Sequence, residues 1–585
     1  MFENIGSKGK NMSLKVVIVG GVAGGASAAA RLRRLNETAE ITIYERTGFM
    51  SYANCGLPYY LGGEITDEAA LTLQTPEKFF SRFRVNVKVA HEVTRIDREA
   101  KSVTVKNLST GETFTDSYDK LILSPGARPV MPSIEGVESN KIFTLRTVED
   151  TFAIDRHIVQ TQARRALVVG GGFIGLEMAE NLTRRGLEVT LLQLTDQVMP
   201  ALDADMASAL HAQLRANRVT LKLNTQVRRF ETSDNGVTAH TDAGAIRADM
   251  VILSVGVEPE STLAREAGLT LGKKGAIVVN EELQTSDASI WAVGDAVEVR
   301  QLVSGDKRLI SLAGPANKMG RMAADNIMGA ARRYRGSLGS SVLKLFDLTV
   351  AMTGLNEKSA QAAGLDYEKI VLCPANHAGY YPGGRAMTVK VLFDRHTRKL
   401  MGAQIVGYEG VDKRIDVFAT ALCAGMTSAD LAELDLAYAP PYSSAKDPVN
   451  MAGFMAENIF DGLVKQFHWH DIDTLRRQGA QLVDTRTTRE YANGHAPGFI
   501  NIPLDELRDR VDELDRAQPV FVMCHTGIRS YIASRILVGH GFDVSNFSGG
   551  HSFYSVVTRE AASVREVFDC GMQKSTGKPC ASSKT

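Results

Sequence analysis

Two cysteines stand in surroundings that suit reactive sulfur. Cys55 lies in SYANCGLPYY, where an asparagine, a glycine and a proline make a turn rather than the face of a core element. Cys524 ends the apolar run VFVM and opens the short loop CHTGIRS. The thiolate is the reactive form of cysteine, and curled backbone N–H groups stabilise a sulfur anion. Without a nearby second cysteine, Cys55 would pair with external sulfur or cycle through sulfenic acid, unless it is a buried structural residue.

Composition narrows the class of protein. The 585 residues are too many for one core and suggest three or four domains. The 67 basic and 67 acidic residues cancel, so the charge favours neither nucleic acid nor an anionic membrane. Six widely spaced cysteines fit a reducing cytoplasm, and no apolar run reaches the roughly 18 residues of a membrane span. We expect a cytoplasmic protein that acts on small molecules, without a metal.

A strand, a glycine turn and a helix open the folded part of the chain, whose true start could be Met12. The run from Lys15 to Val19 predicts a buried parallel strand, and the glycine-rich turn GGVAGG leads into a helix near Ala23. The next strand ends at Glu45, a carboxylate suited to ribose hydroxyls. Such a turn cradles a pyrophosphate. Val22 replaces the middle glycine of the pattern, so alone this turn would also fit an ordinary strand–helix connection.

A second unit follows the glycine pattern in full. Gly170, Gly172 and Gly175 come directly after the strand 166–169, and a helix and another strand follow. Gln193 stands where a ribose-binding carboxylate is usual, with no basic residue directly after it to receive a 2′-phosphate. Two nested units of this kind predict one site for FAD and one for NADH, with NADPH also possible.

Further motifs point to a known family. The strand SIWAVGD ends at Asp295, which suits a flavin ribityl chain or a helix N-cap, and SPGARP covers 124–129. With these motifs the chain resembles the pyridine nucleotide–disulfide oxidoreductases. The resemblance implies FAD-contacting residues at Gly20, Gly21, Ala23, Gly24, Glu45, Arg46, Asn54, Ser124, Gly126, Asp295, Ala313, Asn317 and Tyr438. It implies NAD(P)H-contacting residues at Gly170, Gly172, Phe173, Ile174, Gly175, Gln193 and Gly256, with Phe173 either gating the nicotinamide or simply packing.

The segment SYANCGLP is similar to the signature of the coenzyme A-disulfide reductases. That resemblance implies that Cys55 alternates between a thiolate and a mixed disulfide with coenzyme A. It also implies that coenzyme A is contacted by Ser27, Arg31, Arg34, Ser51, Asn54 and Lys446. Arginine forks suit phosphates, although a solvated basic helix face is the simpler reading of Arg31 and Arg34. Peroxidases and oxidases share the single cysteine but typically lack this segment.

Residues 336–460 resemble the dimerisation domain of the family. The segments YYPGG and YAPPYSSAKDPVN carry tyrosines, prolines and a lysine in loops. In the family this region reaches the other subunit's site, so the resemblance implies a homodimer in which Tyr381 or Tyr442 donates a proton. Ordinary hairpin packing is the alternative for each residue.

A new alternation of short strands and helices begins near residue 468, and this part of the chain resembles a rhodanese domain. Cys524 would carry a persulfide in the loop before a helix that begins near Ser530, unless the unit is an inactive remnant. Arg529 follows in the loop as a substrate-binding residue, and Asp484 would fix its guanidinium. His495 is interpreted as structural.

The fold class expected is α/β, with two nested Rossmann-like domains, an α+β dimerisation domain and a rhodanese domain. The expected boundaries are 13–125 with 285–335 for FAD, 126–284 for NAD(P)H, 336–460 for dimerisation, 468–560 for rhodanese, and 561–585 for a flexible tail that holds Cys570 and Cys580. The sequence predicts an NAD(P)H-dependent reductase of coenzyme A disulfide, coenzyme A persulfide or polysulfide. The alternatives are an NADH oxidase or peroxidase acting through a Cys55 sulfenate, and a sulfur-relay or redox-sensing protein.

Overall fold

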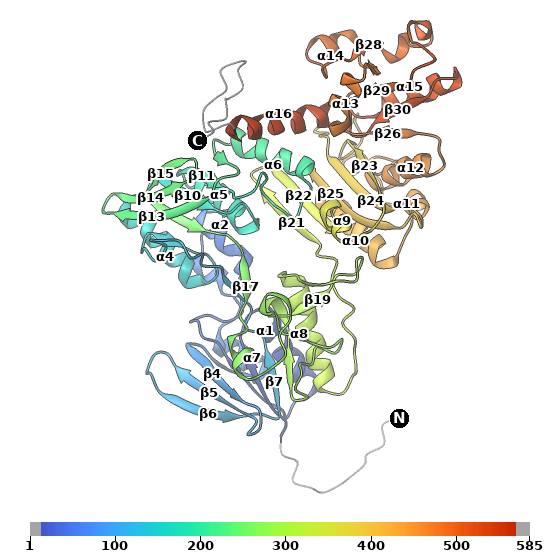
Figure 1. The fold of residues 1–585 in the computed structure, drawn as a ribbon. Coiled ribbons are helices and arrows are strands. Elements are labelled where there is room, and N and C mark those ends of the chain that lie inside the picture. The colour runs from blue at the N-terminus through green and yellow to red at the C-terminus, as the bar shows by residue number, and fades with distance from the viewer. Residues whose placement is uncertain (1–12, 569–585) are drawn as a thin grey trace, which may run out of the picture.

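The computed structural model describes residues 13–568, so Met12, Cys570 and Cys580 lie outside the described part. Its first sheet has five parallel strands in the order β18-β7-β1-β2-β3. Their bounds are Ile290–Ala292, Lys120–Leu123, Lys15–Val19, Glu40–Tyr44 and Asn86–Lys88. Helices α1 (Ala23–Leu35) and α8 (Ala313–Ile327) pack against each other and supply apolar side chains to the core of this sheet. The three-stranded sheet β4-β5-β6 (His91–Asp97, Ser102–Asn107, Thr113–Ser117) extends the unit, which fills the lower part of Figure 1.

The second parallel sheet is inserted into the first unit. The chain leaves through β8 (Ala127–Pro129) and returns through its antiparallel partner β17 (Val257–Pro259). Between them lies the sheet β12-β11-β10-β16-β9. Its strands are Thr220–Lys222, Glu188–Leu192, Arg165–Val169, Met250–Leu253 and Ile142–Phe143, and its helices are α4 (Val148–Thr161), α5 (Phe173–Arg184) and α6 (Ala204–Ala216).

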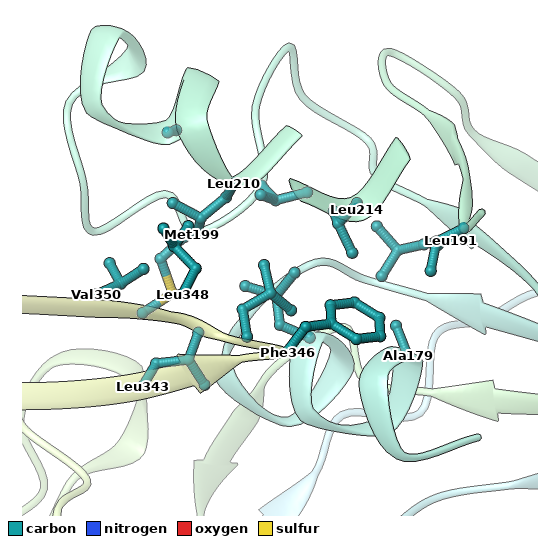
Figure 2. Packing of buried hydrophobic residues seen from close by; sticks show 14 of the residues in the cluster. Ala179, Leu191, Met199, Leu210, Leu214, Leu343, Phe346, Leu348 and Val350 are labelled. Atoms are coloured by element: carbon teal, nitrogen blue, oxygen red, sulfur yellow. The ribbon is translucent and has the colours of Figure 1, made fainter. Parts of the chain in front are cut away.

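An antiparallel sheet of order β21-β22-β25-β24-β23 follows. Its strands are Ser341–Leu345, Leu348–Gly354, Leu400–Gly407, Thr388–Asp394 and Tyr367–Leu372, with helices α9 (Glu357–Ala362), α10 (Val411–Ala424), α11 (Ser428–Glu433) and α12 (Pro448–Phe460). The tip of the β21–β22 hairpin enters the preceding unit: Phe346 and Leu348 lie in one apolar cluster with Leu210 and Leu214 of α6 (Figure 2).

The last sheet is parallel again, in the order β26-β30-β29-β27-β28. Its strands are Lys465–Phe467, Val544–Phe547, Val520–Met523, Gln481–Asp484 and Ile500–Asn501, with helices α13 (Ile472–Arg477), α14 (Thr488–Ala492), α15 (Ile528–Gly539) and α16 (Gly550–Phe568). Helix α16 runs back over α6 (Figure 1), where Glu560 pairs with Arg215. This unit is therefore docked on the rest of the chain.

The mixed α/β fold class expected from the sequence is confirmed, with parallel sheets in three units and an antiparallel sheet in the fourth. Helix α15 begins at Ile528, two residues before the expected position, because Gly527 takes a left-handed φ of 107° and turns the chain into the helix directly. Among residues 13–568, no helix is both long and apolar enough to cross a membrane.

Candidate active sites for electron and sulfur transfer

The first glycine turn is built for close approach. Gly20 has φ +94°, and a Cβ there would lie 2.1 Å from the carbonyl oxygen of Ser124. Gly24 and Gly320 let α1 and α8 touch, because a Cβ on Gly320 would lie 2.2 Å from the Gly24 carbonyl oxygen. Glu45 accepts a hydrogen bond from the backbone N–H of Gly21 at 2.8 Å. The carboxylate at the end of β2 thus holds the turn in place.

The second glycine turn repeats this construction with a different side chain. Gly170 has φ +104°, and a Cβ would lie 2.4 Å from the carbonyl oxygen of Ser254. Gln193 Oε1 accepts from the N–H of Gly171 at 2.8 Å, and its Nε2 donates to Thr195. Gln193 therefore does for this turn what Glu45 does for the first, without a charge.

Both helices after the glycine turns begin without a side-chain cap. The N-cap of α1 is Val22 and that of α5 is Gly172, and neither provides a capping hydrogen bond, whereas α4 begins with a capping box at Thr147. The first-turn N–H groups of α1 and α5 remain available, and the helix dipole favours an anion there. The pyrophosphates of FAD and of NAD(P)H fit these two positions.

Cys55 is exposed and stands at the start of α2 (Leu57–Leu61), in the single 3₁₀ turn Asn54–Gly56. The loop before it is fixed at Ser51, which has φ +45° and whose N–H donates to the Gly21 carbonyl at 2.9 Å. The segment that carries Cys55 is therefore tied to the first glycine turn through Ser51.

Three charged groups surround Cys55. Burial, followed by the carboxylate of Glu177 on α5, raises the pKa of the Cys55 thiol. The guanidinium of Arg146 lowers it. Asp295 adds to the rise and pairs with Arg146 at 3.0 Å. The structure thus brings Asp295 to the cysteine, as part of an ion pair.

Three of the residues expected to meet coenzyme A, Ser27, Arg31 and Arg34, lie on α1 beside α8. Ser27 donates to Asn317 at 2.5 Å, and Arg31 Nε pairs with Asp325 at 2.6 Å. Arg34 is exposed at the end of α1. Asp325 therefore fixes the position of the Arg31 guanidinium, so that only groups close to this position can bind to it.

The tyrosine loops form an exposed surface on the antiparallel unit. Tyr380 and Tyr438 share a hydrogen bond of 2.6 Å between their hydroxyls, while Tyr381 and Tyr442 are 41% and 74% exposed. Beneath them the buried Arg414 joins the two loops: its guanidinium donates to the Asn376 and Tyr442 carbonyls and to the carboxylate of Asp447. Lys446 is exposed in the same loop.

The sulfur of Cys524 lies inside a small donor cradle. The N–H of Gly527 approaches Sγ at 3.1 Å and the Ser530 hydroxyl at 3.3 Å, and Cys524 is only 1% exposed. These donors suit a sulfur anion at the start of α15.

The expectation for Asp484 was wrong. Arg529 makes two bonds of 2.7 Å to Glu490, which stands at the start of α14, whereas Asp484 is held by Arg486 at 2.7 Å. Asp484 ends β27 and lies beneath the loop, so it meets the nearer arginine of its own turn. His495 stacks on Tyr491, with ring centroids 3.8 Å apart, which agrees with a structural role.

Comparison with known proteins decides the family. The family model "Pyridine nucleotide-disulphide oxidoreductase" matches residues 14–320, the family's dimerisation domain matches 340–448, and a rhodanese-like domain matches 470–555. The chain is a pyridine nucleotide-disulphide oxidoreductase. It is therefore an oxidoreductase of a family that uses FAD and NAD(P)H.

Several relatives combine or share these parts. A coenzyme A disulfide reductase from Staphylococcus haemolyticus is 39% identical over 446 residues, which are 76% of this chain and 100% of the relative. The reduced CoADR-RHD of Bacillus anthracis is 48% identical with a TM-score of 0.92, over 94% of this chain and 99% of that one. An NAD-dependent persulfide reductase from A. fulgidus is 38% identical with a TM-score of 0.88, over 92% and 100%.

Other expected contacts of this oxidoreductase can be placed in the fold. Phe173 and Ile174 open α5 and pack half-buried on the core, Ala313 opens α8, and Gly256 has φ +120° just before β17. Arg46 pairs with Glu260 at 3.5 Å.

Sequence reasoning missed Arg146, Glu177, Arg414 and Glu490. Glu177 stands inside the second glycine motif, GGGFIGLE, so the sequence shows its place in the motif. The sequence does not show that Glu177 acts on Cys55. Arg146 and Arg414 carry no local signal, because their partners are distant in the sequence.

Proposed function

We propose that this oxidoreductase passes electrons from NAD(P)H through FAD to Cys55, which reduces coenzyme A disulfide, coenzyme A persulfide or polysulfide. The observation that carries the proposal is the single cysteine at the first glycine turn, without a partner cysteine in its segment, in a chain that also holds a cradled Cys524. The relatives named above as coenzyme A disulfide and persulfide reductases, two of them nearly full-length matches, support it.

The flavin and nicotinamide would supply the hydride and electron chemistry when bound. The chain's own part is to hold their pyrophosphates at α1 and α5 and to present Cys55 beside the first turn. Arg146 stabilises the Cys55 thiolate and is itself oriented by Asp295. The thiolate attacks one sulfur of the substrate disulfide or persulfide and breaks its S–S bond, so that the other half leaves as a thiolate or hydrosulfide. The mixed disulfide that remains on Cys55 is then reduced.

Coenzyme A would lie along α1, with its phosphates near Arg31 and Arg34 and its thiol at Cys55. Ser27, Ser51 and Asn54 are the expected contacts on this path. The exposed tyrosine loops favour a homodimer, in which Tyr381 or Tyr442, with Tyr438 and Lys446, meets the partner's site. We propose the unit boundaries 13–125 with 285–335, 126–284, 336–460 and 468–560, and a cytoplasmic location, which the cysteine usage supports.

Cys524 would take sulfane sulfur as a persulfide in its cradle and pass it toward the reductase site. An NADH oxidase is the second candidate, because a water-forming NADH oxidase from Lactobacillus brevis shares the fold at 28% identity and a TM-score of 0.74, over 77% of this chain. That match leaves about a quarter of this chain uncovered, and an oxidase that acts through Cys55 would give Cys524 no role.

Mass spectrometry of the purified protein tests the proposal. We expect a coenzyme A adduct on Cys55 that NADH removes, and NADH oxidation that depends on added coenzyme A disulfide. NADH oxidation that needs only oxygen, with Cys55 as a sulfenic acid, would favour the oxidase. Stoichiometric transfer of sulfur to a protein without turnover of NADH would favour a relay.

A further inference from the structure

The rhodanese unit meets the antiparallel unit through the short turn that follows β30 and begins α16, residues 548–552, which we call the bridging segment. Strand β23 is the last strand of the antiparallel sheet, next to β24, and Cys373 directly follows it. The Cys373 thiol donates to the Gly549 carbonyl at 3.0 Å. The Ser548 hydroxyl accepts from the Val371 N–H at 2.9 Å. Two hydrogen bonds therefore hold the bridging segment to the end of β23.

The bridging segment also holds the loop that carries the reactive sulfur. The His551 N–H donates to the Cys524 carbonyl at 2.7 Å. The N–H and the hydroxyl of Ser552 donate to the His525 carbonyl at 3.1 Å and 2.9 Å. A Cβ on Gly550 would lie 2.5 Å from the same carbonyl oxygen, so only a glycine allows this approach. The bridging segment thus joins β23 to the sulfur loop by printed contacts on both of its sides.

These contacts bear on the donor cradle because a peptide unit is planar. In a trans peptide the N–H points away from the C=O. Since the carbonyls of Cys524 and His525 are held toward α16, the N–H groups of His525 and Thr526 are held toward the opposite side. The chain then continues into Gly527, whose N–H lies 3.1 Å from the sulfur of Cys524. The bridging segment therefore fixes the backbone path from which the cradle is built.

Cys373 acts here as a donor and not as a second reactive thiol. Burial raises the pKa of its thiol to about 11, and the negative charge of Cys524 adds to the rise, so Cys373 keeps its proton at neutral pH. Cys373 is 9% exposed and lies in one apolar cluster with Met523 and Phe547 of the rhodanese sheet. A thiol that keeps its proton offers one weak donor, which the Gly549 carbonyl accepts.

We propose that Cys373 is a positioning residue for the sulfur site of Cys524. Its thiol holds the bridging segment against β23, and the bridging segment holds the loop in the shape that stabilises a Cys524 persulfide. In the step that it supports, the Cys524 thiolate attacks a terminal sulfur of a polysulfide, one S–S bond breaks, and the polysulfide leaves one sulfur shorter. The inference rests on the proposed role of Cys524 and adds that the antiparallel unit completes its site.

The test separates the hydrogen bond from the packing. Cys373→Val keeps a buried apolar side chain but donates no hydrogen bond, whereas Cys373→Ser keeps a donor for the Gly549 carbonyl. Each FAD-loaded enzyme is treated with polysulfide, and mass spectrometry follows the lifetime of the Cys524 persulfide. Loss of the bond in Cys373→Val should shorten this lifetime about fivefold and lower kcat/KM for polysulfide by a similar factor. Cys373→Ser should stay within about twofold of wild type.

Coenzyme A disulfide is the internal standard, because its proposed reduction does not pass through Cys524. Its turnover should be the same in wild type and in each variant. Ser548→Ala removes the other hydrogen bond to β23, so it should shorten the persulfide lifetime in the same direction, and it decides the question where a Cys373 variant does not fold. Cys423→Val, at an exposed cysteine of α10, is the matched control and should change neither measurement.

A wild-type lifetime in Cys373→Val would overturn the proposal. An equal loss in Cys373→Val and Cys373→Ser would also overturn it, since the donor would then make no difference. A parallel fall in turnover of coenzyme A disulfide would mean that Cys373 supports the fold as a whole, and an unchanged Ser548→Ala would contradict the role of the bridging segment. If wild type forms no persulfide on Cys524, the proposed function of that cysteine fails and this inference with it. A stable persulfide that is indifferent to Cys373 rejects this inference alone.

Discussion

Cys55 is the residue on which the proposed reductase depends. Cys55→Ser should abolish reduction of coenzyme A disulfide, because a serine hydroxyl cannot form a mixed disulfide. The contacts that hold the first glycine turn, Glu45 to Gly21 and Ser51 to Gly21, do not involve the sulfur. FAD should therefore stay bound, and NADH should still bleach its absorbance in a stopped-flow experiment. Turnover of coenzyme A disulfide by the variant would contradict the one-cysteine mechanism.

Cys524 should matter for one class of substrate only. Its cradle consists of the Gly527 N–H and the Ser530 hydroxyl, which hold sulfur without any electron source. Cys524→Ser should leave turnover of coenzyme A disulfide within about twofold of wild type and should reduce turnover of polysulfide about tenfold or more, a difference of about 1.4 kcal/mol in barrier.

Both assays on one purified Cys524→Ser sample provide the comparison. Equal loss on both substrates would mean that Cys524 supports the fold, since its buried Sγ also accepts the bonds from Gly527 and Ser530 that hold the loop. Equal activity on both would mean that the rhodanese unit serves another partner. The exposed Cys423 offers a matched control, Cys423→Ser, which should change neither rate.

At the scale of single residues, the sequence predicts what a local motif contains and misses what the fold brings to it. The segments around Cys55 and Cys524 were readable because turn residues and glycines lie within a few positions of each sulfur. Arg146 is 91 positions from Cys55 and Arg414 is 33 from Asp447, with no periodicity that joins them. The error at Asp484 has the same origin, because Glu490 and Asp484 are equally plausible partners for Arg529 until the path of β27 into α14 is known.

At the scale of elements, the two strand–turn–helix units show that either a glutamate or a glutamine can hold the glycine turn. Glu45 and Gln193 both accept from the second glycine of their turn at 2.8 Å. The order of elements and the turn positions could be predicted because the glycine pattern and the apolar strands repeat. The hydrogen-bond partner of the Gln193 side chain could not be predicted, since an amide can bond to a ribose, to a backbone N–H or to both.

Gln193→Glu tests what the missing charge does at the end of β11. A glutamate keeps an oxygen for the N–H of Gly171, so the turn should persist. Its negative charge would repel the 2′-phosphate of NADPH, whereas the neutral glutamine does not. We expect measurable NADPH oxidation in wild type and at least about a tenfold lower NADPH to NADH ratio of kcat/KM in the variant. Steady-state rates with both coenzymes provide the measurement, and a wild-type enzyme that does not oxidise NADPH would contradict the reading of Gln193.

At the scale of the whole molecule, the units are joined by buried polar contacts as well as by apolar packing. Lys390 of β24 is 1% exposed and contacts Asp203 at 3.0 Å, Asp205 at 2.8 Å and Glu357 at 2.5 Å. The two aspartates belong to the NAD(P)H-side unit, where they begin α6, and Glu357 belongs to α9 of the antiparallel unit. Cys373 adds a second tie, because its Sγ donates to the Gly549 carbonyl at 3.0 Å, next to the rhodanese loop. Such ion pairs cannot be predicted from the sequence, since lysine, aspartate and glutamate side chains are usually exposed to solvent.

Lys390→Met should loosen the junction between these units. The side chain keeps a similar length, but three carboxylates lose their common cation, and breaking a buried ion pair in this way costs about 3–5 kcal/mol. We expect a lower Tm and faster proteolysis between α6 and β21, measured against Lys465→Met, whose exposed pair with Asp543 should cost at most about 1 kcal/mol.

The deficit of Lys390→Met should depend on pH in one direction. Lys390, with the help of Lys369, lowers the pKa of Glu357 to about 2 despite burial. A carboxylate with a depressed pKa stabilises the fold above its unfolded value near 4.5, and this stability is lost as the pH falls toward 2. The gap in Tm between wild type and variant should therefore shrink below about pH 4.5, as the wild type loses the stability that its paired Glu357 supplies. A gap that stays the same on acidification would mean that Lys390 acts by packing alone, because a packing defect does not disappear when the carboxylates take up protons.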